Sequence, residues 1–200
     1  LTAAPLAKLK NAPLLLTGGE QLSAQAEAEL KRLDVNTVYI TSGTQVIKPA
    51  VTEKLLDLGI TVKNLGGNNR FETSLNIAKE IGSVQQFRNI IVSTAWSNAD
   101  ALSAASIAAS KGIPILLTGP DSLHASVKAY VDSKKDTIKN SYVIGGTKAV
   151  GEAVLNTLPN PTRAGGANRY ETNIEIIKLF ADDIKPGKIF IANGENSHLV

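Results

Sequence analysis

The sequence predicts an α/β fold made of tandem repeats, in which each repeat is a small parallel sheet flanked by helices. One reason is that short, uninterrupted apolar runs alternate with longer segments of helical periodicity, a pattern typical of βαβ crossovers. A second reason is that this whole pattern occurs twice along the 200 residues. Each occurrence is long enough to form a small sheet with its covering helices.

The repeat consists of three blocks of similar sequence that occur in the same order. The blocks are separated by 101, 103 and 99 residues, and eleven of the 22 aligned residues in the first block are identical. Collinear blocks of this kind do not arise by chance and are the signature of a repeat architecture. The paired blocks are residues 1–22 with 102–123, 39–47 with 142–150, and 66–73 with 165–172.

The phase of the repeat predicts three units that differ in completeness. We expect residues 1–87 to form a first repeat without its N-terminal strand, 88–187 a complete second repeat, and 188–200 the start of a third. The protein is therefore expected to extend in both directions. The segment Lys188–Asn193 would be a strand with an open edge, which needs further chain or a neighbouring molecule to cover it.

The elements of the second repeat can be read from its apolar pattern. We expect strands at Ile90–Val92, Ile113–Leu117 and Asn140–Ile144, with helices at Asp100–Ser110 and Ser122–Ser133. Apolar runs without alternation favour strands that are covered on both faces. Ligands of parallel sheets lie beyond the carboxyl ends of the strands. The polar residues in the loops expected there include Thr44, Ser97, Asn98, Thr147 and Lys148.

The composition restricts the chemistry of the chain. Cysteine is absent, which excludes disulfides, thiol catalysis and thiolate metal sites. His124 and His198 stand at non-equivalent positions of the repeats, so no catalytic or metal-binding set can be built around them. No phosphate-binding glycine motif and no apolar run of roughly 20 residues occurs. We expect no cofactor, metal, nucleic acid or membrane partner, while the net charge of +3 permits an anionic one.

A motif of Asn, Arg, an aromatic residue, Glu and Thr occurs at 69–73 and again at 168–172. The Asn and Glu predict a helix start with a capping box. The capping box leaves Arg70 and Arg169 unexplained, because a cation in the first helical turn opposes the helix dipole by ~0.3–1 kcal/mol. Either a carboxylate of a neighbouring element pairs with each arginine, or each arginine binds an anionic ligand beside the free helix N–H groups.

Two residues near the end of the first strand of the second repeat have both an ordinary and a functional interpretation. Asp100 stands at the expected start of an Ala-rich helix, where an N-cap is the ordinary explanation, and it is also a candidate ligand contact. Trp96 is the only tryptophan. It could stack on a sugar or anchor its loop by packing.

Four motifs in order give the chain a family resemblance. They are Asp-Ala-Leu at 100–102, Pro-Ile-Leu-Leu-Thr-Gly at 114–119, Val-Ile-Gly-Gly-Thr at 143–147 and Asn-Arg-Tyr-Glu-Thr at 168–172. With these motifs the chain resembles the cell wall binding repeat 2 family, found in clostridial surface-layer and cell wall proteins and in modifiers of bacillus autolysins. The resemblance covers essentially the whole chain.

The resemblance implies three Rossmann-like repeats packed as a pseudo-threefold assembly. It also implies a protein exported to the surface of a Gram-positive bacterium and held on the cell wall through an anionic secondary polymer. The anchoring motif Ile-Leu-Leu of the family corresponds to Ile115, Leu116 and Leu117, and to Leu14, Leu15 and Leu16 in the first repeat. We expect these to be buried strand residues that maintain the fold. Ser42 stands where the family has the first of two paired glycines.

We therefore expect a binding module without enzymatic activity, which holds phosphate or carboxylate groups of an anionic wall glycopolymer across the junctions between repeats. One alternative is an α/β enzyme acting on a wall sugar or nucleotide, although neither repeat contains a nucleophile, a histidine pair or a cofactor loop. Another is a structural surface-layer subunit that binds other subunits. The candidate polymer-binding residues are Thr44, Arg70, Ser97, Asn98, Asp100, Thr147, Lys148 and Arg169.

Overall fold

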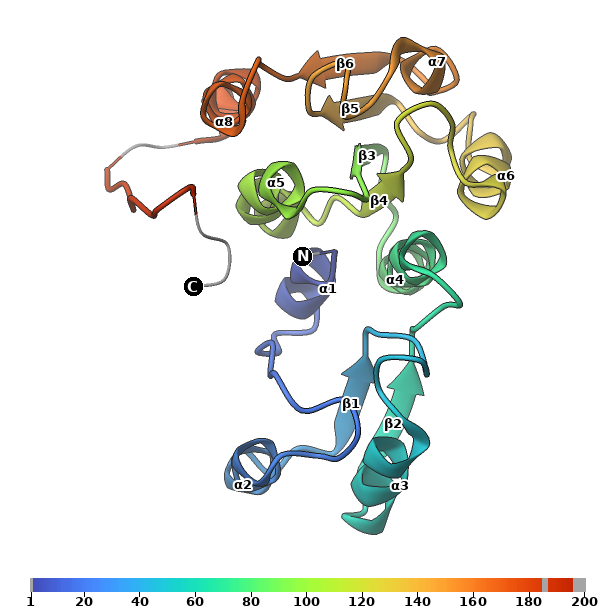
Figure 1. The fold of residues 1–200 in the computed structure, drawn as a ribbon, viewed down its shortest axis with the longest axis vertical. Coiled ribbons are helices and arrows are strands. Elements are labelled where there is room, and N and C mark those ends of the chain that lie inside the picture. Colours follow the sequence, from blue (N-terminus) through green and yellow to red (C-terminus); the bar gives the residue numbers. More distant parts are fainter. Residues whose placement is uncertain (1, 185–186, 196–200) are drawn as a thin grey trace.

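The computed structural model of the chain describes residues 2–184 and 187–195. It contains two parallel sheets with helices packed around them (Figure 1). We call the parts built around the two sheets the first unit and the second unit, in chain order. This arrangement confirms the predicted α/β fold of parallel sheets flanked by helices.

The sheet of the second unit has four strands, and all neighbouring strands are parallel. The strands are β3 (Asn89–Thr94), β4 (Ile115–Thr118), β5 (Asn140–Ile144) and β6 (Pro161–Ala164), in the spatial order β4-β3-β5-β6. Parallel neighbours require long crossover connections, and helices provide them here. The third strand predicted for this repeat, β5, has the predicted bounds.

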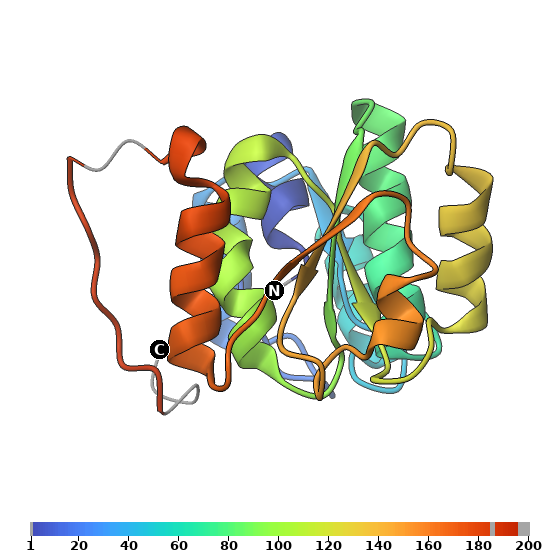
Figure 2. The same cartoon turned by 90° about the horizontal axis from the view of Figure 1, so that it is seen from above.

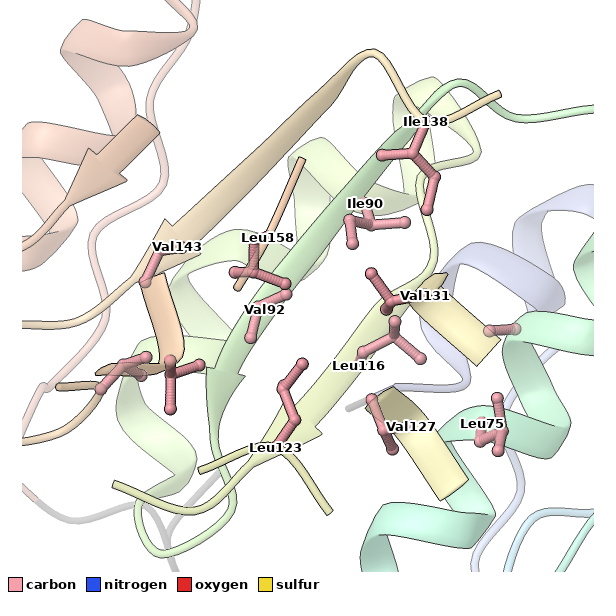
Figure 3. Close-up of a cluster of buried hydrophobic side chains, with 13 residues drawn as sticks. Leu75, Ile90, Val92, Leu116, Leu123, Val127, Val131, Ile138, Val143 and Leu158 are labelled. Carbon is pink, nitrogen blue, oxygen red and sulfur yellow. The ribbon is translucent and has the colours of Figure 1, made fainter. Parts of the chain in front are cut away.

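Helices cover both faces of this sheet (Figure 2). One face packs against α5 (Asn98–Lys111) and α8 (Arg169–Leu179). The other packs against α4 (Arg70–Val84), α6 (Ala125–Ser133) and α7 (Glu152–Leu155). Ile91 of β3 enters the first core, while Ile90 and Val92 enter the second (Figure 3). Alternate residues of one strand thus serve two cores, which explains why its apolar run has no polar interruption.

The first unit follows the second element by element, but its sheet has only two strands among the described residues. These are β1 (Thr37–Ile40) and β2 (Thr61–Asn64), which are parallel. By position in the repeat, α1 (Ala4–Leu9) corresponds to α5, α2 (Ala24–Arg32) to α6, β1 to β5, α3 (Pro49–Asp57) to α7, β2 to β6, and α4 to α8. No described residue of the first unit corresponds to β3. The expected equivalence of Leu1 with Leu102 lies outside the described residues.

The expectation that Leu14, Leu15 and Leu16 are buried strand residues is wrong. They belong to no strand and are 58%, 44% and 90% exposed. Their counterparts lie in β4, where Leu116 is 0% exposed. The difference arises because β3 pairs with β4 and covers it, whereas no described strand of the first unit lies in that position.

Three further expectations about local structure are corrected. The segment Lys188–Asn193 forms no strand, because no described segment pairs with it. Its apolar side chains are exposed. Helix α6 begins at Ala125 rather than Ser122, and α5 begins at Asn98, two residues before the predicted start. A short 3-10 helix, Ala181–Asp183, follows α8.

Helix α4 contributes to the cores of both units. Its Leu75 and Ala78 pack against the second-unit sheet, while Ile77 and Ile81 pack with Leu6 of α1. Helix α1 also packs against α5. The two units are therefore joined by a continuous apolar contact, and the division of the chain at residues 87 and 88 stays a prediction.

Candidate functional site

A polar cleft of about 610 Å³ lies at the junction between the two units. It is formed mainly by the turn after β1, the loop before α4, and the loop between β3 and α5, beyond the carboxyl ends of the strands where parallel sheets bind ligands. We call it the junction cleft. The described residues that line it are Thr2, Thr41, Ser42, Gly43, Gln45, Val46, Gly67, Asn68, Asn69, Arg70, Thr73, Thr94, Ala95, Ser97, Asn98, Ala101 and Leu117.

Close backbone contacts between glycines hold two of these loops together. A Cβ on Gly43 would overlap the carbonyl oxygen of Gly67, and a Cβ on Gly66 would overlap that of Ser42. Glycine is therefore required at both positions. Ser42 itself is tolerated because its φ is not positive, whereas its counterpart Gly145 has φ of 117°, a conformation that side chains rarely adopt.

The start of α4 is capped through the two residues that the sequence predicts. Oδ1 of Asn69 accepts a hydrogen bond from the backbone N–H of Glu72 at 2.9 Å. The carboxylate of Glu72 accepts a hydrogen bond from the backbone N–H of Asn68 at 3.0 Å. In the usual capping box the donor is the N–H of the N-cap residue itself, which here is Asn69. The corresponding asparagine caps α8. Each cap thereby places the arginine that follows the asparagine at the first position of its helix.

Both arginines of the motif hydrogen bond to a backbone carbonyl of a segment further along the chain. Nη1 of Arg70 donates to the carbonyl oxygen of Ala95 at 2.6 Å, and Nη1 of Arg169 donates to that of Gly194 at 2.8 Å. Each acceptor lies 25 residues after its arginine. Neither arginine is in an ion pair with a described carboxylate. Arg70 thus connects the start of α4 to the loop after β3, and Arg169 connects the start of α8 to the segment 187–195, which forms no strand.

The junction cleft combines one fixed cation with two helix starts. Arg70 is the only charged residue among the described lining residues. Ser97 is the N-cap of α5 but accepts no capping hydrogen bond, and Asn98 is the first residue of that helix. Both side chains are exposed. Free N–H groups and the positive ends of the dipoles of α4 and α5 add to the arginine charge, so the cleft favours anions.

Trp96 lies beside Arg70 but is not among the lining residues of the junction cleft. The guanidinium carbon of Arg70 is 5.2 Å from the centroid of the indole ring. The indole meets Phe71 edge-on at a centroid distance of 6.2 Å, and Phe71 stacks on His124 at 5.2 Å. Trp96 is nevertheless 65% exposed. His198 lies outside the described residues.

Asp100 is the third residue of α5, so its interpretation as an N-cap is wrong. The helix begins earlier because Ser97 occupies the cap position. The Asp100 carboxyl is buried beneath the turn that follows β5, where a Cβ on Gly145 would lie 2.9 Å from its Oδ2. Burial raises the pKa of this carboxyl above its usual value, and the positive charge of Arg169 opposes that rise. Asp100 does not line the junction cleft.

The remaining candidate residues lie on the corresponding turns of the two units. Thr44 follows β1 between two residues that line the junction cleft, Gly43 and Gln45, but it does not line the cleft itself. Thr147 and Lys148 are exposed on the equivalent turn after β5. Of the eight candidate polymer-binding residues, the structure brings three together in the junction cleft: Arg70, Ser97 and Asn98.

Sequence reasoning missed several residues of the cleft. Gln45 lies next to the candidate Thr44 in the turn after β1, and Thr94 is the last residue of β3, so their strand-end positions were an available signal. Asn68 precedes the Asn-Arg motif and carried no signal of its own. Its position in the cleft depends on the fold of the loop before α4.

Comparison with known proteins identifies the family. The family model of cell wall binding domain 2 (CWB2) matches residues 1–52 and 64–155. The chain belongs to the CWB2 family. The first match lies within the first unit, and the second runs from the end of β2 in the first unit to the end of α7 in the second.

Relatives of this CWB2 chain include two proteins of Bacillus subtilis (strain 168). The N-acetylmuramoyl-L-alanine amidase LytC is 32% identical over 194 residues, and the amidase enhancer is 34% identical over 197 residues. Each alignment covers 97% of this chain but only 38% and 26%, respectively, of the relative. The chain therefore spans well under half the length of these two proteins.

Two solved structures from Clostridium difficile share the fold. Cwp6 matches with a TM-score of 0.82 at 30% sequence identity, and Cwp8 with a TM-score of 0.79 at 32%. The matches cover 90% of this chain, and 30% and 31% of the two solved chains. Membership in the cell wall binding domain 2 family supports cell wall binding and association with the wall. In the described part of the chain, no helix is long and apolar enough to span a membrane, and no group of residues could form a metal site.

Proposed function

We propose that the junction cleft binds an anionic polymer of the cell wall, and that the chain thereby anchors its parent protein non-covalently on the surface of a Gram-positive bacterium. The observation that carries the proposal is the placement of Arg70. It lines the cleft, no described carboxylate pairs with it, and it lies at the start of α4 opposite the start of α5. The bacterial sources of the relatives support the surface location.

The hydrogen bond to Ala95 prepares Arg70 to bind such a polymer. It uses one nitrogen, Nη1, and orients the planar guanidinium without neutralising its charge. The other N–H groups form no hydrogen bond with the described residues, so they are available for phosphate or carboxylate oxygens. The hydroxyl and amide groups of Ser97, Asn98 and Gln45 suit the sugar hydroxyls of a glycopolymer.

We propose that binding involves no covalent chemistry. The described lining residues of the cleft include no Asp, Glu, His or Cys. The serines and threonines of the lining therefore have no general base among these residues to activate them. We assign the amidase activity named for LytC to a part of that protein beyond the 38% that matches this chain. The alternative of an enzyme predicts release of soluble wall fragments, whereas the anchoring module predicts none.

We also propose that successive repeats pack in the same manner, as in a pseudo-threefold assembly. The support is the recurrence of one contact at two junctions. Arg70 bonds to the loop after β3, and Arg169 bonds at the same sequence separation to Gly194. The turn residues Thr147 and Lys148 then belong to a second cleft of the same kind.

Retention on purified cell walls tests the anchoring proposal. We expect Arg70→Gln to reduce retention and flatten its dependence on salt, because one screened ionic contact is lost. Arg88→Gln is the matched control, since it removes the same charge from an exposed residue outside the cleft. Walls stripped of their non-peptidoglycan polymers should retain neither the parent chain nor the control.

Two outcomes would contradict this assignment. One is equal retention by Arg70→Gln and Arg88→Gln variants that have the same melting temperature. The other is undiminished binding to the stripped walls, which would indicate peptidoglycan itself as the ligand.

A further inference from the structure

Trp96 stands in the loop after β3, between two residues that line the junction cleft, Ala95 and Ser97. Tryptophan side chains are highly buried on average, because their large rings gain most from leaving water. Trp96 departs from this pattern, since it is 65% exposed. Core packing therefore does not account for an indole at the edge of this cleft.

Contacts from neighbouring elements orient the exposed indole. The guanidinium of Arg70, at the start of α4, lies over the ring at 5.2 Å from its centroid. The next residue, Phe71, meets the indole edge-on and is itself stacked on His124 ahead of α6. The backbone N–H of Trp96 donates to Oγ1 of Thr94 at 3.2 Å. Because the ring is already oriented, a ligand that contacts it loses little affinity to ordering the loop.

The hydrogen bond that positions the arginine does not require an aromatic neighbour. Ala95, which accepts the bond from Arg70, corresponds to Gly194, which accepts the bond from Arg169. The residue after Gly194 is Glu195, where the first of these two contacts has Trp96. The same arginine contact thus forms beside a glutamate and beside a tryptophan, so the indole is free to serve another purpose.

We propose that the indole of Trp96 stacks on a pyranose sugar of the wall polymer, while the anionic group next to that sugar binds Arg70 in the junction cleft. This inference rests on the proposed function and specifies the ligand chemistry of that same site. The C–H groups on the flat face of a pyranose are apolar and slightly positive, and the face of an aromatic ring is negative. Stacking therefore combines electrostatic attraction with removal of apolar surface from water.

Arg70 links the two contacts, because it touches the indole and also lines the junction cleft. A polymer that lies on Trp96 thus reaches the only charged residue among the described lining residues. A neutral glycan would use the indole alone, and a sugar-free polyanion would use the arginine alone. Two contacts on one polymer reinforce each other, since the first raises the local concentration of the second group. The site therefore selects a glycan that carries anionic groups.

Intrinsic fluorescence tests the stacking contact directly, because Trp96 is the only tryptophan of the chain. Titration with the non-peptidoglycan polymer released from purified walls should shift the emission to shorter wavelength and reduce its quenching by acrylamide, since a stacked sugar excludes water from the ring. Polyphosphate, a polyanion without sugar, should change neither. Unchanged emission at polymer concentrations that block retention of the chain on walls would overturn the proposal. An equal response to polyphosphate would also overturn it.

Wall retention at several salt concentrations separates stacking from an effect exerted through Arg70. We expect Trp96→Leu to weaken retention by about tenfold, the size of one aromatic stacking contact. The salt dependence should stay that of the parent chain, because stacking is not screened by ions. Trp96→Tyr should restore most of the retention. The control Leu56→Ala removes exposed apolar surface from α3, outside the cleft, and should change nothing.

Two outcomes for Trp96→Leu would contradict the stacking contact. A salt dependence as flat as that of Arg70→Gln would show that the indole acts only by positioning the arginine. Retention equal to that of the parent chain would show that the indole contributes nothing. In either case Arg70→Gln distinguishes the two proposals. If it loses retention, the cleft remains the binding site and only the sugar contact is wrong, whereas undiminished retention by Arg70→Gln refutes the anchoring proposal as well.

Discussion

Leu116 and Leu15 occupy the same position of the repeat and allow a paired test of whether the anchoring motif maintains the fold. Leu116 is fully buried in the core between the second-unit sheet and α4, α6 and α7, while Leu15 is 44% exposed and lines a cavity beside β1. Truncation of a buried leucine to alanine costs ~2–5 kcal/mol, since it removes apolar contacts and leaves a cavity. A partly exposed leucine loses only part of its transfer free energy, ~1 kcal/mol or less.

We therefore expect Leu116→Ala to lower the free energy of unfolding by about 3 kcal/mol and Leu15→Ala by about 1 kcal/mol or less. For a chain of this size, 1 kcal/mol corresponds to a shift of ~2–4 °C in Tm. The two variants should therefore differ by several degrees. Urea unfolding followed by far-UV circular dichroism measures the difference.

Wall retention of the same two variants separates fold maintenance from direct contact. If Leu116 acts through the fold, the folded fraction of Leu116→Ala should bind walls as tightly as the parent chain. Equal losses of stability in the two variants would refute the burial argument. Loss of retention by a fully folded Leu116→Ala would instead place this residue in the binding site.

Three further predictions concern Asp100, Gly66 and Asn69. Burial raises the pKa of Asp100 in the folded state above its ordinary value of 3.8, so the folded chain binds a proton more tightly than the unfolded chain. The contribution of this carboxyl to stability therefore falls as the pH rises from 3.8 through the pKa of the folded state. Asp100→Asn should therefore gain stability relative to the parent chain as pH rises through this window in urea titrations, and a constant difference would contradict the argument. Gly66→Ala should lower Tm and impair wall retention, because its Cβ overlaps a backbone carbonyl, whereas Gly187→Ala has no neighbour within 4 Å and should change neither. Asn69→Ala should cost ~1 kcal/mol in thermal unfolding through loss of the α4 cap, and an unchanged Tm would show that the cap does not limit stability.

The parts of the fold that depend on local sequence were predicted well. The bounds predicted for β5 and the helix start predicted at Asn69 agree with the structure, because strand formation and capping depend largely on a few neighbouring residues. Helix boundaries were less accurate. The start of α5 was placed at Asp100, since Asp is a good N-cap, but Ser97 takes that position in the fold.

The candidate site was predicted only in part. The motif marks Arg70 as unusual and predicts either an ion pair or a ligand contact for it, but not its bond to the carbonyl of Ala95. A hydrogen bond to a backbone carbonyl 25 residues away cannot be predicted from the types of side chain in the sequence. Likewise, Asp100 was grouped with Ser97 and Asn98 because they are adjacent in sequence. The helix turns its side chain away from the cleft and toward Gly145.

The sequence by itself determined the repeat, its α/β character, the absence of cysteine chemistry and the resemblance to a wall-binding family, because these depend on pattern and composition. The tertiary structure decided which copies of a repeated motif are buried. Leu14, Leu15 and Leu16 nearly match the residues of β4 in sequence, yet they are exposed. The physical reason is that burial of a strand in a parallel sheet depends on its neighbours. Among the described residues, only the second unit has a strand in the position of β3 to provide that pairing.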